Sequence, residues 1–162
     1  MGKVENRLFM AELTLPEVFS APPGVEFAFD LVRISGRHAY ISGHGPIDGS
    51  KPLMQGKVGS DLTPELGREA ARLTGLSIIA SLKEALDELD RVTQWVKVLG
   101  LVNCAPGFSG TPGVINGFSE LILELWGPER GAHARSAIGV AELPFDIPVE
   151  VEAIVEVDQE ET

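Results

Sequence analysis

The last regular segment of the chain places the strongest constraint on the fold. From Val149 to Val157 every odd-numbered residue is Val or Ala, whereas the even-numbered positions carry three Glu and one Ile. A strict period of two is typical of a β-strand with one buried face. The Val and Ala side chains must therefore face a hydrophobic core, and the Glu-rich face must point elsewhere.

We expect residues 134–143 to pair with this strand as a hairpin around the turn 144–146. If Ile138 and Val140 are the buried residues of the first strand, they lie opposite Val151 and Val149. That register places a second set of side chains on one common face, namely Arg135, Ala137, Gly139, Glu150, Glu152 and Ile154. Small residues on a sheet face favour close approach by another surface, so we expect this face to be shared in a closed homo-oligomer.

The remaining patterns predict an α+β domain. Apolar residues recur at three- and four-residue steps over 64–89, where Thr63 and Pro64 are typical of a helix start. A second helix is expected over 113–126. The strands are expected at 26–35, at 38–42 and at 92–104, which is apolar on both parities and therefore central. The expected order is β-β-α-β-α-β-β, with two helices on one face of a mixed sheet.

The predicted organisation has one folded domain. Residues 1–20, with a short helix at 4–13, are interpreted as an N-terminal helical appendage, 21–158 as the domain, and 159–162 as a C-terminal tail. No apolar stretch approaches the ~18 residues of a membrane span, so no membrane partner is expected. The first dozen residues show no apolar signal-peptide core, and a cytoplasmic location is expected.

The charge balance limits the partners. The chain of 162 residues has 24 acidic and 13 basic residues, a formal net charge of −11. Nucleic-acid binding needs clustered Lys and Arg, so no nucleic-acid partner is expected. Cys104 is the one cysteine, which excludes an internal disulfide and a metal site built from cysteines, and we interpret it as a small buried hydrophobe. The three histidines lack metal-ligand spacing, and no metal site is predicted.

Three motifs closely resemble the RidA (YjgF) family. They are ARSAIGVAELP at 134–144 followed by VEVEAIV at 149–155, YISGH at 40–44, which resembles the SGQ strand motif, and Asn116 as the Asn at the start of a helix. The resemblance covers residues from about 20 to 157. It implies a chorismate-mutase-like fold and a homotrimer whose sheets form a central barrel, with ligand sites at the clefts between subunits.

The resemblance also implies an activity, the hydrolysis of reactive 2-imino or 2-enamino acids to 2-keto acids and ammonia without a cofactor. Arg135 would bind the substrate carboxylate, a task that suits a planar guanidinium. Glu150 and the backbone C=O of Ala137 would hold the attacking water. The resemblance assigns to the cleft, in addition, Ser42, Gly43 and Asn116.

Three positions depart from the family pattern. Ala137 stands where the family has Cys, Phe27 where it has a pocket Tyr, and His44 where it has Gln. We expect Phe27 and His44 to line the substrate pocket. The anion anchor and the Glu are retained, so the departures indicate a divergent branch.

Several alternatives stay open on the sequence alone. The chain could be a non-catalytic module that binds small carboxylates, in which Arg135 is needed and Glu150 is not. Endoribonuclease activity is disfavoured by the net charge, and chorismate mutase chemistry rests on fold analogy only. Arg135 could instead form a structural ion pair with Glu152 or Glu156 at a subunit contact. Parity does not decide whether Glu150 or Glu152 faces the cleft.

Overall fold

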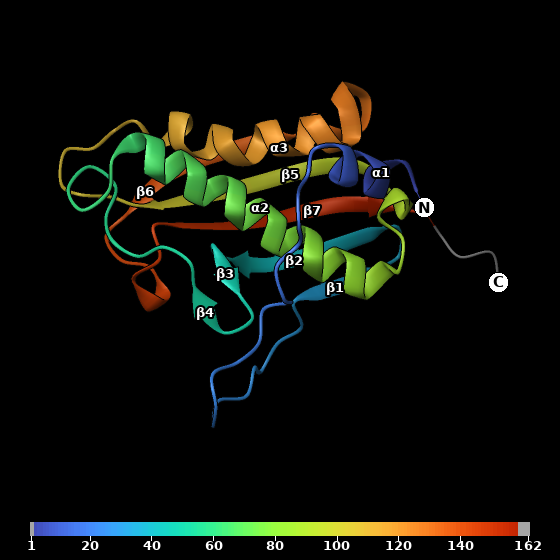
Figure 1. Ribbon diagram of the computed structural model, residues 1–162, viewed down its shortest axis with the longest axis horizontal. Helices are drawn as coiled ribbons and strands as arrows, with labels where there is room; N and C mark the ends of the chain where they lie inside the picture. The colour runs from blue at the N-terminus through green and yellow to red at the C-terminus, as the bar shows by residue number, and fades with distance from the viewer. Residues whose placement is uncertain (1, 159–162) are drawn as a thin grey trace.

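A five-stranded mixed sheet with helices on one face forms the centre of the molecule (Figure 1). The computed structural model describes residues 2–158; the predicted tail 159–162 lies outside them. The strand order is β1-β2-β7-β5-β6, in which β5 and β6 are parallel and the other pairs antiparallel. The elements are α1 (Lys3–Met10), β1 (Val32–Ser35), β2 (His38–His44), β3 (Ile47–Asp48), β4 (Lys51–Pro52), α2 (Pro64–Leu86), η1 (Leu89–Arg91), β5 (Val92–Asn103), α3 (Thr111–Gly131), β6 (Ala134–Val140), η2 (Pro144–Asp146) and β7 (Val149–Val157).

The predicted α+β order is confirmed, with a small hairpin of β3 and β4 inserted before α2. The helix start predicted at Pro64 is also confirmed, because Thr63 caps it by accepting a hydrogen bond from the backbone N–H of Leu66 at 3.2 Å. The second long helix continues past its expected end. Gly127 adopts φ 77°, so the chain bends there before Pro128 and a last turn follows.

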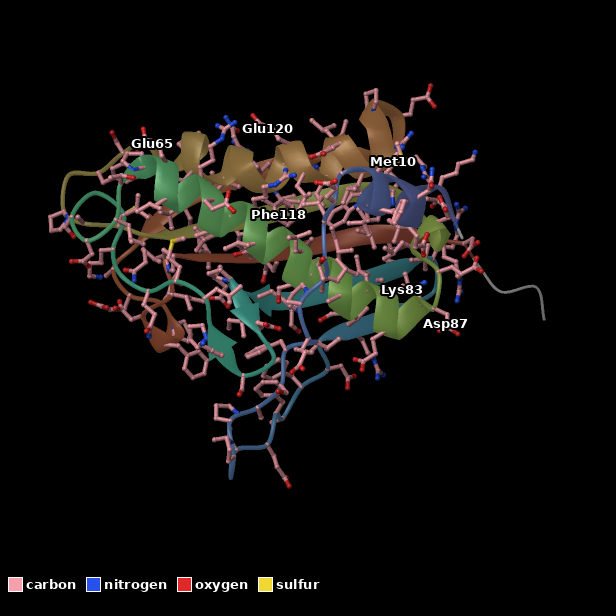
Figure 2. The ribbon with its side chains drawn as sticks, viewed as in Figure 1. Met10, Glu65, Lys83, Asp87, Phe118 and Glu120 are labelled. Carbon is pink, nitrogen blue, oxygen red and sulfur yellow. The ribbon has the colours of Figure 1, made fainter. Side chains whose placement is uncertain are left out.

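The two long helices pack closely because small residues line their contact. An added Cβ at Gly117 would lie 2.0 Å from the backbone oxygen of Arg68, and one at Gly75 would lie 2.7 Å from Leu121 Cδ2. Phe118 fills the space beneath the helices (Figure 2), with its ring centroid 5.8 Å from that of Trp95 on β5. The core therefore lies between α2, α3 and the sheet.

The N-terminal helix α1 also contributes to this core. Val4 and Leu8 are buried, whereas Phe9 and Met10 on its other side are exposed. The Glu5 carboxylate accepts a hydrogen bond from the backbone N–H of Leu89 at 2.9 Å, which joins α1 to η1. None of the helices within residues 2–158 combines the length and apolar character of a bilayer span.

The predicted hairpin of the last two strands is wrong. β6 pairs with β5 in parallel and β7 pairs with the other side of β5, so Ile138 lies opposite Leu101 and not Val151. The eight residues of segment 141–148 are long enough to pass around the end of β5. The central, two-sided character predicted for residues 92–104 is confirmed by this position.

The predicted faces of β6 are also wrong. Arg135, Ala137 and Gly139 lie on the helix side, and Ile138, 48% exposed, lies on the open side of the sheet. The reason is packing: an added Cβ at Gly139 would lie 2.9 Å from Cys104 Sγ, so only a small residue fits under the segment that leads into α3. Arg135 therefore shares no face with Glu150.

Candidate functional site

Arg135 is the centre of a polar network at the edge of the sheet. Its Nη1 donates to Asn116 Oδ1 at 2.9 Å and to Ser119 Oγ at 3.1 Å, and its Nη2 lies 3.4 Å from the backbone oxygen of Pro112. All three acceptors are neutral and belong to α3. Within the described residues of one protomer, Arg135 forms no ion pair with Glu152 or Glu156, because those residues lie on the other face and Glu156 faces Arg37 and His38. An ion pair with either residue across a subunit contact stays a prediction.

Within residues 2–158, the charge of Arg135 is thus oriented but not neutralised by a carboxylate. Planar guanidinium groups bind carboxylates through two parallel hydrogen bonds. A half-buried, fixed and uncompensated guanidinium is suited to an external organic anion.

His133 and Ser119 support the position of this guanidinium. His133 Nδ1 lies 2.7 Å from the Gly131 carbonyl oxygen, so Nδ1 carries the proton. Its Nε2 then accepts from the Ser119 hydroxyl at 2.9 Å, which leaves Ser119 Oγ as an acceptor for Arg135. Burial lowers the pKa of His133 and the positive charge of Arg135 adds to this, so the neutral form is favoured.

Glu150 lies on β7, on the open side of the sheet, and its carboxylate rests against Gly43. An added Cβ at Gly43 would lie 2.0 Å from Glu150 Oε1, so the absence of a side chain there makes room for the carboxylate. Burial raises the pKa of Glu150, and the neighbouring carboxylate of Glu152 raises it further. A carboxylate with a raised pKa is a stronger base near neutral pH.

A pocket of about 250 Å³ opens beside Glu150. Its walls come from four separate parts of the chain, represented by Phe19, Phe27, Gly43 and the η2 residue Phe145. Among the residues that the structure describes, Glu150 is the one ionisable residue that lines the pocket. The structure thus brings together three of the predicted residues, Phe27, Gly43 and Glu150, and it favours Glu150 over Glu152 as the carboxylate of the pocket.

Two predicted pocket residues have other positions. His44 is buried between the sheet and α2, with Nδ1 2.7 Å from the Ser42 carbonyl oxygen and Nε2 2.8 Å from Ser81 Oγ. It does not line the pocket, because both ring nitrogens already have partners in the core. The Ser42 hydroxyl donates to the Asp30 carbonyl oxygen at 2.7 Å, so it fixes the segment that carries Phe27.

Ala137 lies on the same strand as Arg135. Its carbonyl oxygen accepts a hydrogen bond from Thr111 Oγ1 at 3.1 Å, and since a carbonyl has two lone pairs, one remains for a water molecule. Cys104 is half-buried beside this strand, and burial raises the pKa of its thiol. Residues 2–158 contain no group of three His, Cys, Asp or Glu placed to hold a metal ion.

Arg135 and Glu150 do not meet within one protomer. β5 separates their strands: Arg135 lies opposite Val98, and Glu150 lies opposite Leu101, three residues further along. Two strand spacings and three residues put their Cα atoms roughly 14 Å apart. Their side chains also leave the sheet on opposite faces, so the molecule carries two half-sites, one with Arg135, Asn116 and Ala137 and one with Glu150, Gly43 and Phe27.

Comparisons with known proteins agree on one family. A family model described as "YjgF/chorismate_mutase-like, putative endoribonuclease" matches residues 5–156. Protein TCP17 of Trypanosoma cruzi is 43% identical over 157 residues, which cover 97% of this chain and 96% of that protein.

Two solved structures are similar to nearly the whole chain. A protein of unknown function from Agrobacterium tumefaciens is 36% identical with a TM-score of 0.86, over 96% of this chain and 92% of that one. A protein from Shewanella oneidensis described as a "putative endoribonuclease" is 34% identical with a TM-score of 0.87, over 96% of this chain and 100% of that one. The motifs, the fold and these comparisons show that the chain belongs to the YjgF/chorismate-mutase-like family, as the resemblance to RidA predicts.

Proposed function

We propose that this protein hydrolyses reactive 2-imino or 2-enamino acids to 2-keto acids and ammonia without a cofactor, at sites shared by two subunits of a homotrimer. The observation that carries the proposal is the Arg135 guanidinium, held by three neutral oxygens and facing no carboxylate within residues 2–158. Its role is to bind the substrate carboxylate and so fix the position of carbon 2.

Glu150 supplies the base. It accepts a proton from a water molecule whose oxygen attacks carbon 2 of the protonated imine, and a C–O bond forms as the C=N bond becomes single. The proton then passes from Glu150 to the amino nitrogen. The C–N bond breaks and ammonia leaves, while the new hydroxyl group becomes the C=O of the 2-keto acid and gives its proton to Glu150, which releases it to the solvent. The carbonyl of Ala137 holds the same water through its free lone pair. An activated imine has a low barrier, so positioning and one proton acceptor are sufficient.

The separation of the half-sites supports the shared site. α2 and α3 cover one face of the sheet, whereas the opposite face carries Tyr40 and Ile138 at 46% and 48% exposure. An apolar sheet face of this kind is typical of a subunit contact. A neighbouring subunit on this face would bring its Arg135 edge toward Glu150, and closed contacts of this head-to-tail kind give a ring.

The test generates imino acids with an amino-acid oxidase and follows the formation of 2-keto acid above the spontaneous rate. We expect acceleration by the wild type and its loss in Arg135→Ala. Arg72→Ala is the matched control, because Arg72 lies on α2 and faces Glu124 at 3.0 Å, and we expect it to behave as the wild type. No acceleration with any of several imino acids would refute the proposal.

Two alternative functions predict different experimental results with the same purified protein. A carboxylate-binding module without turnover would bind its ligand equally well in Glu150→Gln, as calorimetry would show. An endoribonuclease, the function in the family description, would cleave RNA with an activity that stays with the protein through purification. The net charge of −11 disfavours that function, because it repels phosphates.

A further inference from the structure

Aromatic rings from separate parts of the sequence line the pocket beside Glu150. Phe19, Phe27, Phe29 and Phe145 contribute to its walls, with Ile47 and Ile147. The ring of Phe27 lies between two others, with centroids 4.9 Å from Phe19 and 5.0 Å from Phe29, to which it is stacked. The rings of Phe19, Phe27 and Phe29 therefore form one continuous aromatic wall, and Phe145 lines the same pocket.

Two of the aromatic rings that line the pocket are partly exposed. Phe29 is 53% and Phe145 is 49% exposed, although aromatic rings are usually buried when the fold allows it. Rings at the rim of a pocket offer a contact surface to a ligand, because an apolar group that covers them removes their exposed apolar area from water.

Phe145 is held in place at a cost to its backbone. It adopts φ 57° and ψ 18°, a left-handed conformation that bulky residues rarely adopt. Its carbonyl oxygen accepts a hydrogen bond from Gln55 Nε2 at 2.7 Å, and the next residue, Asp146, accepts from the backbone N–H of Gly56 at 2.8 Å. Strain that neighbouring contacts maintain is characteristic of binding sites, so the ring position is set before a ligand enters.

The size of the pocket defines what fits. Its volume is about 250 Å³, and a cavity of about 150 Å³ lined by aliphatic and aromatic side chains already binds benzene. A phenyl ring with its methylene group fills such a space, whereas the single carbon beyond carbon 2 in 2-aminoacrylate leaves most of it empty.

We infer that the pocket binds the side chain of the substrate, and that the preferred substrates are 2-imino acids with an aromatic or large apolar side chain. The inference rests on the proposed function. Glu150, in the pocket wall, marks the place of the attacked carbon, the carboxylate points out toward Arg135 of a neighbouring subunit, and carbon 3 points to the phenylalanines.

The kinetic test compares the imino acids formed from D-phenylalanine and D-alanine by one D-amino-acid oxidase. We expect kcat/KM to be at least about tenfold higher for the aromatic substrate, since each extra apolar group in a fitted pocket contributes about tenfold or more. Phe145→Ala and Phe29→Ala should lower this ratio about fivefold or more. Phe9→Ala removes a ring that is 71% exposed on α1, and it should leave the ratio unchanged.

A binding test separates this inference from the proposed function. Calorimetry with 3-phenylpropanoate and propanoate, which are not substrates, should show tighter binding of the aromatic acid, and Phe145→Ala should reduce the difference about fivefold or more. This result without turnover of any imino acid would refute the deaminase and keep the aromatic pocket. Acceleration of both imino acids with equal kcat/KM, or equal affinity for the two acids, would overturn the inference on the pocket.

Discussion

Gly43 gives the sharpest test of how Glu150 is positioned. An added Cβ at Gly43 would lie 2.0 Å from Glu150 Oε1 and 2.9 Å from Cδ, whereas ordinary contact begins at 3.4 Å. In Gly43→Ala the carboxylate must therefore retreat by at least about 1.4 Å. A displacement of about 1 Å in a catalytic group costs about 100-fold in rate, so we expect a loss of that order in kcat/KM.

The fold should survive this change. Gly43 does not have a positive φ, so alanine fits its backbone, and the displaced atoms form the free end of a side chain. We therefore expect the midpoint of urea unfolding to stay close to that of the wild type. Gly113→Ala, where an added Cβ meets nothing within 4 Å, is the matched control and should keep full activity. Wild-type rates in a folded Gly43→Ala would refute the positioned role of Glu150.

Three further predictions concern stability, pH and the positioning of Arg135. Phe145→Gly should be more stable than Phe145→Ala by about 0.5–1 kcal/mol in urea unfolding, because only glycine relieves the left-handed conformation; equal midpoints would contradict this. Burial raises the pKa of Glu150, so between its ordinary and its raised pKa the folded state holds a proton that the unfolded state has lost, and the free energy of unfolding should fall as the pH rises through this range. Glu150→Gln should remove this pH dependence in urea unfolding, and an unchanged pH dependence would contradict the prediction. His133→Ala should raise KM several-fold with little change in kcat, because the Ser119 hydroxyl loses its acceptor and no longer holds Arg135 in a fixed position. A several-fold fall in kcat at constant KM would contradict this.

The sequence predicts the elements of this fold better than their pairing. The helix start at Pro64 and the central strand 92–103 depend on local signals, namely a cap and an apolar run, and both are confirmed. The pairing of residues 134–140 depends on a partner 37 residues earlier in the chain, since Ala134 lies opposite Lys97. The alternation of residues in β6 indicates that its two faces differ, but not which face packs against the helices. Gly139 lies on the helix side, where only a small residue fits.

The sequence likewise predicts some residues of the candidate site and not others. Arg135, Glu150 and Phe27 are indicated by motifs, and the structure gives each a position that a binding or catalytic role needs. Ser119 and His133 carry no motif, because their role comes from the approach of α3 to β6. The pocket brings together Phe19 and Phe145, which are more than 100 positions apart, and the alternation of Phe27 and Phe29 is its local signal in the sequence.

Mixed assemblies test the shared site most directly. Arg135→Ala and Glu150→Gln, carried on differently tagged chains, should each be inactive alone, and the co-expressed proteins are purified through both tags. In a closed ring of three subunits, every doubly tagged ring has one contact with an intact Arg135 and an intact Glu150 on neighbouring chains, so we predict about one third of wild-type activity. Doubly tagged assemblies that stay inactive would contradict a site built from two subunits.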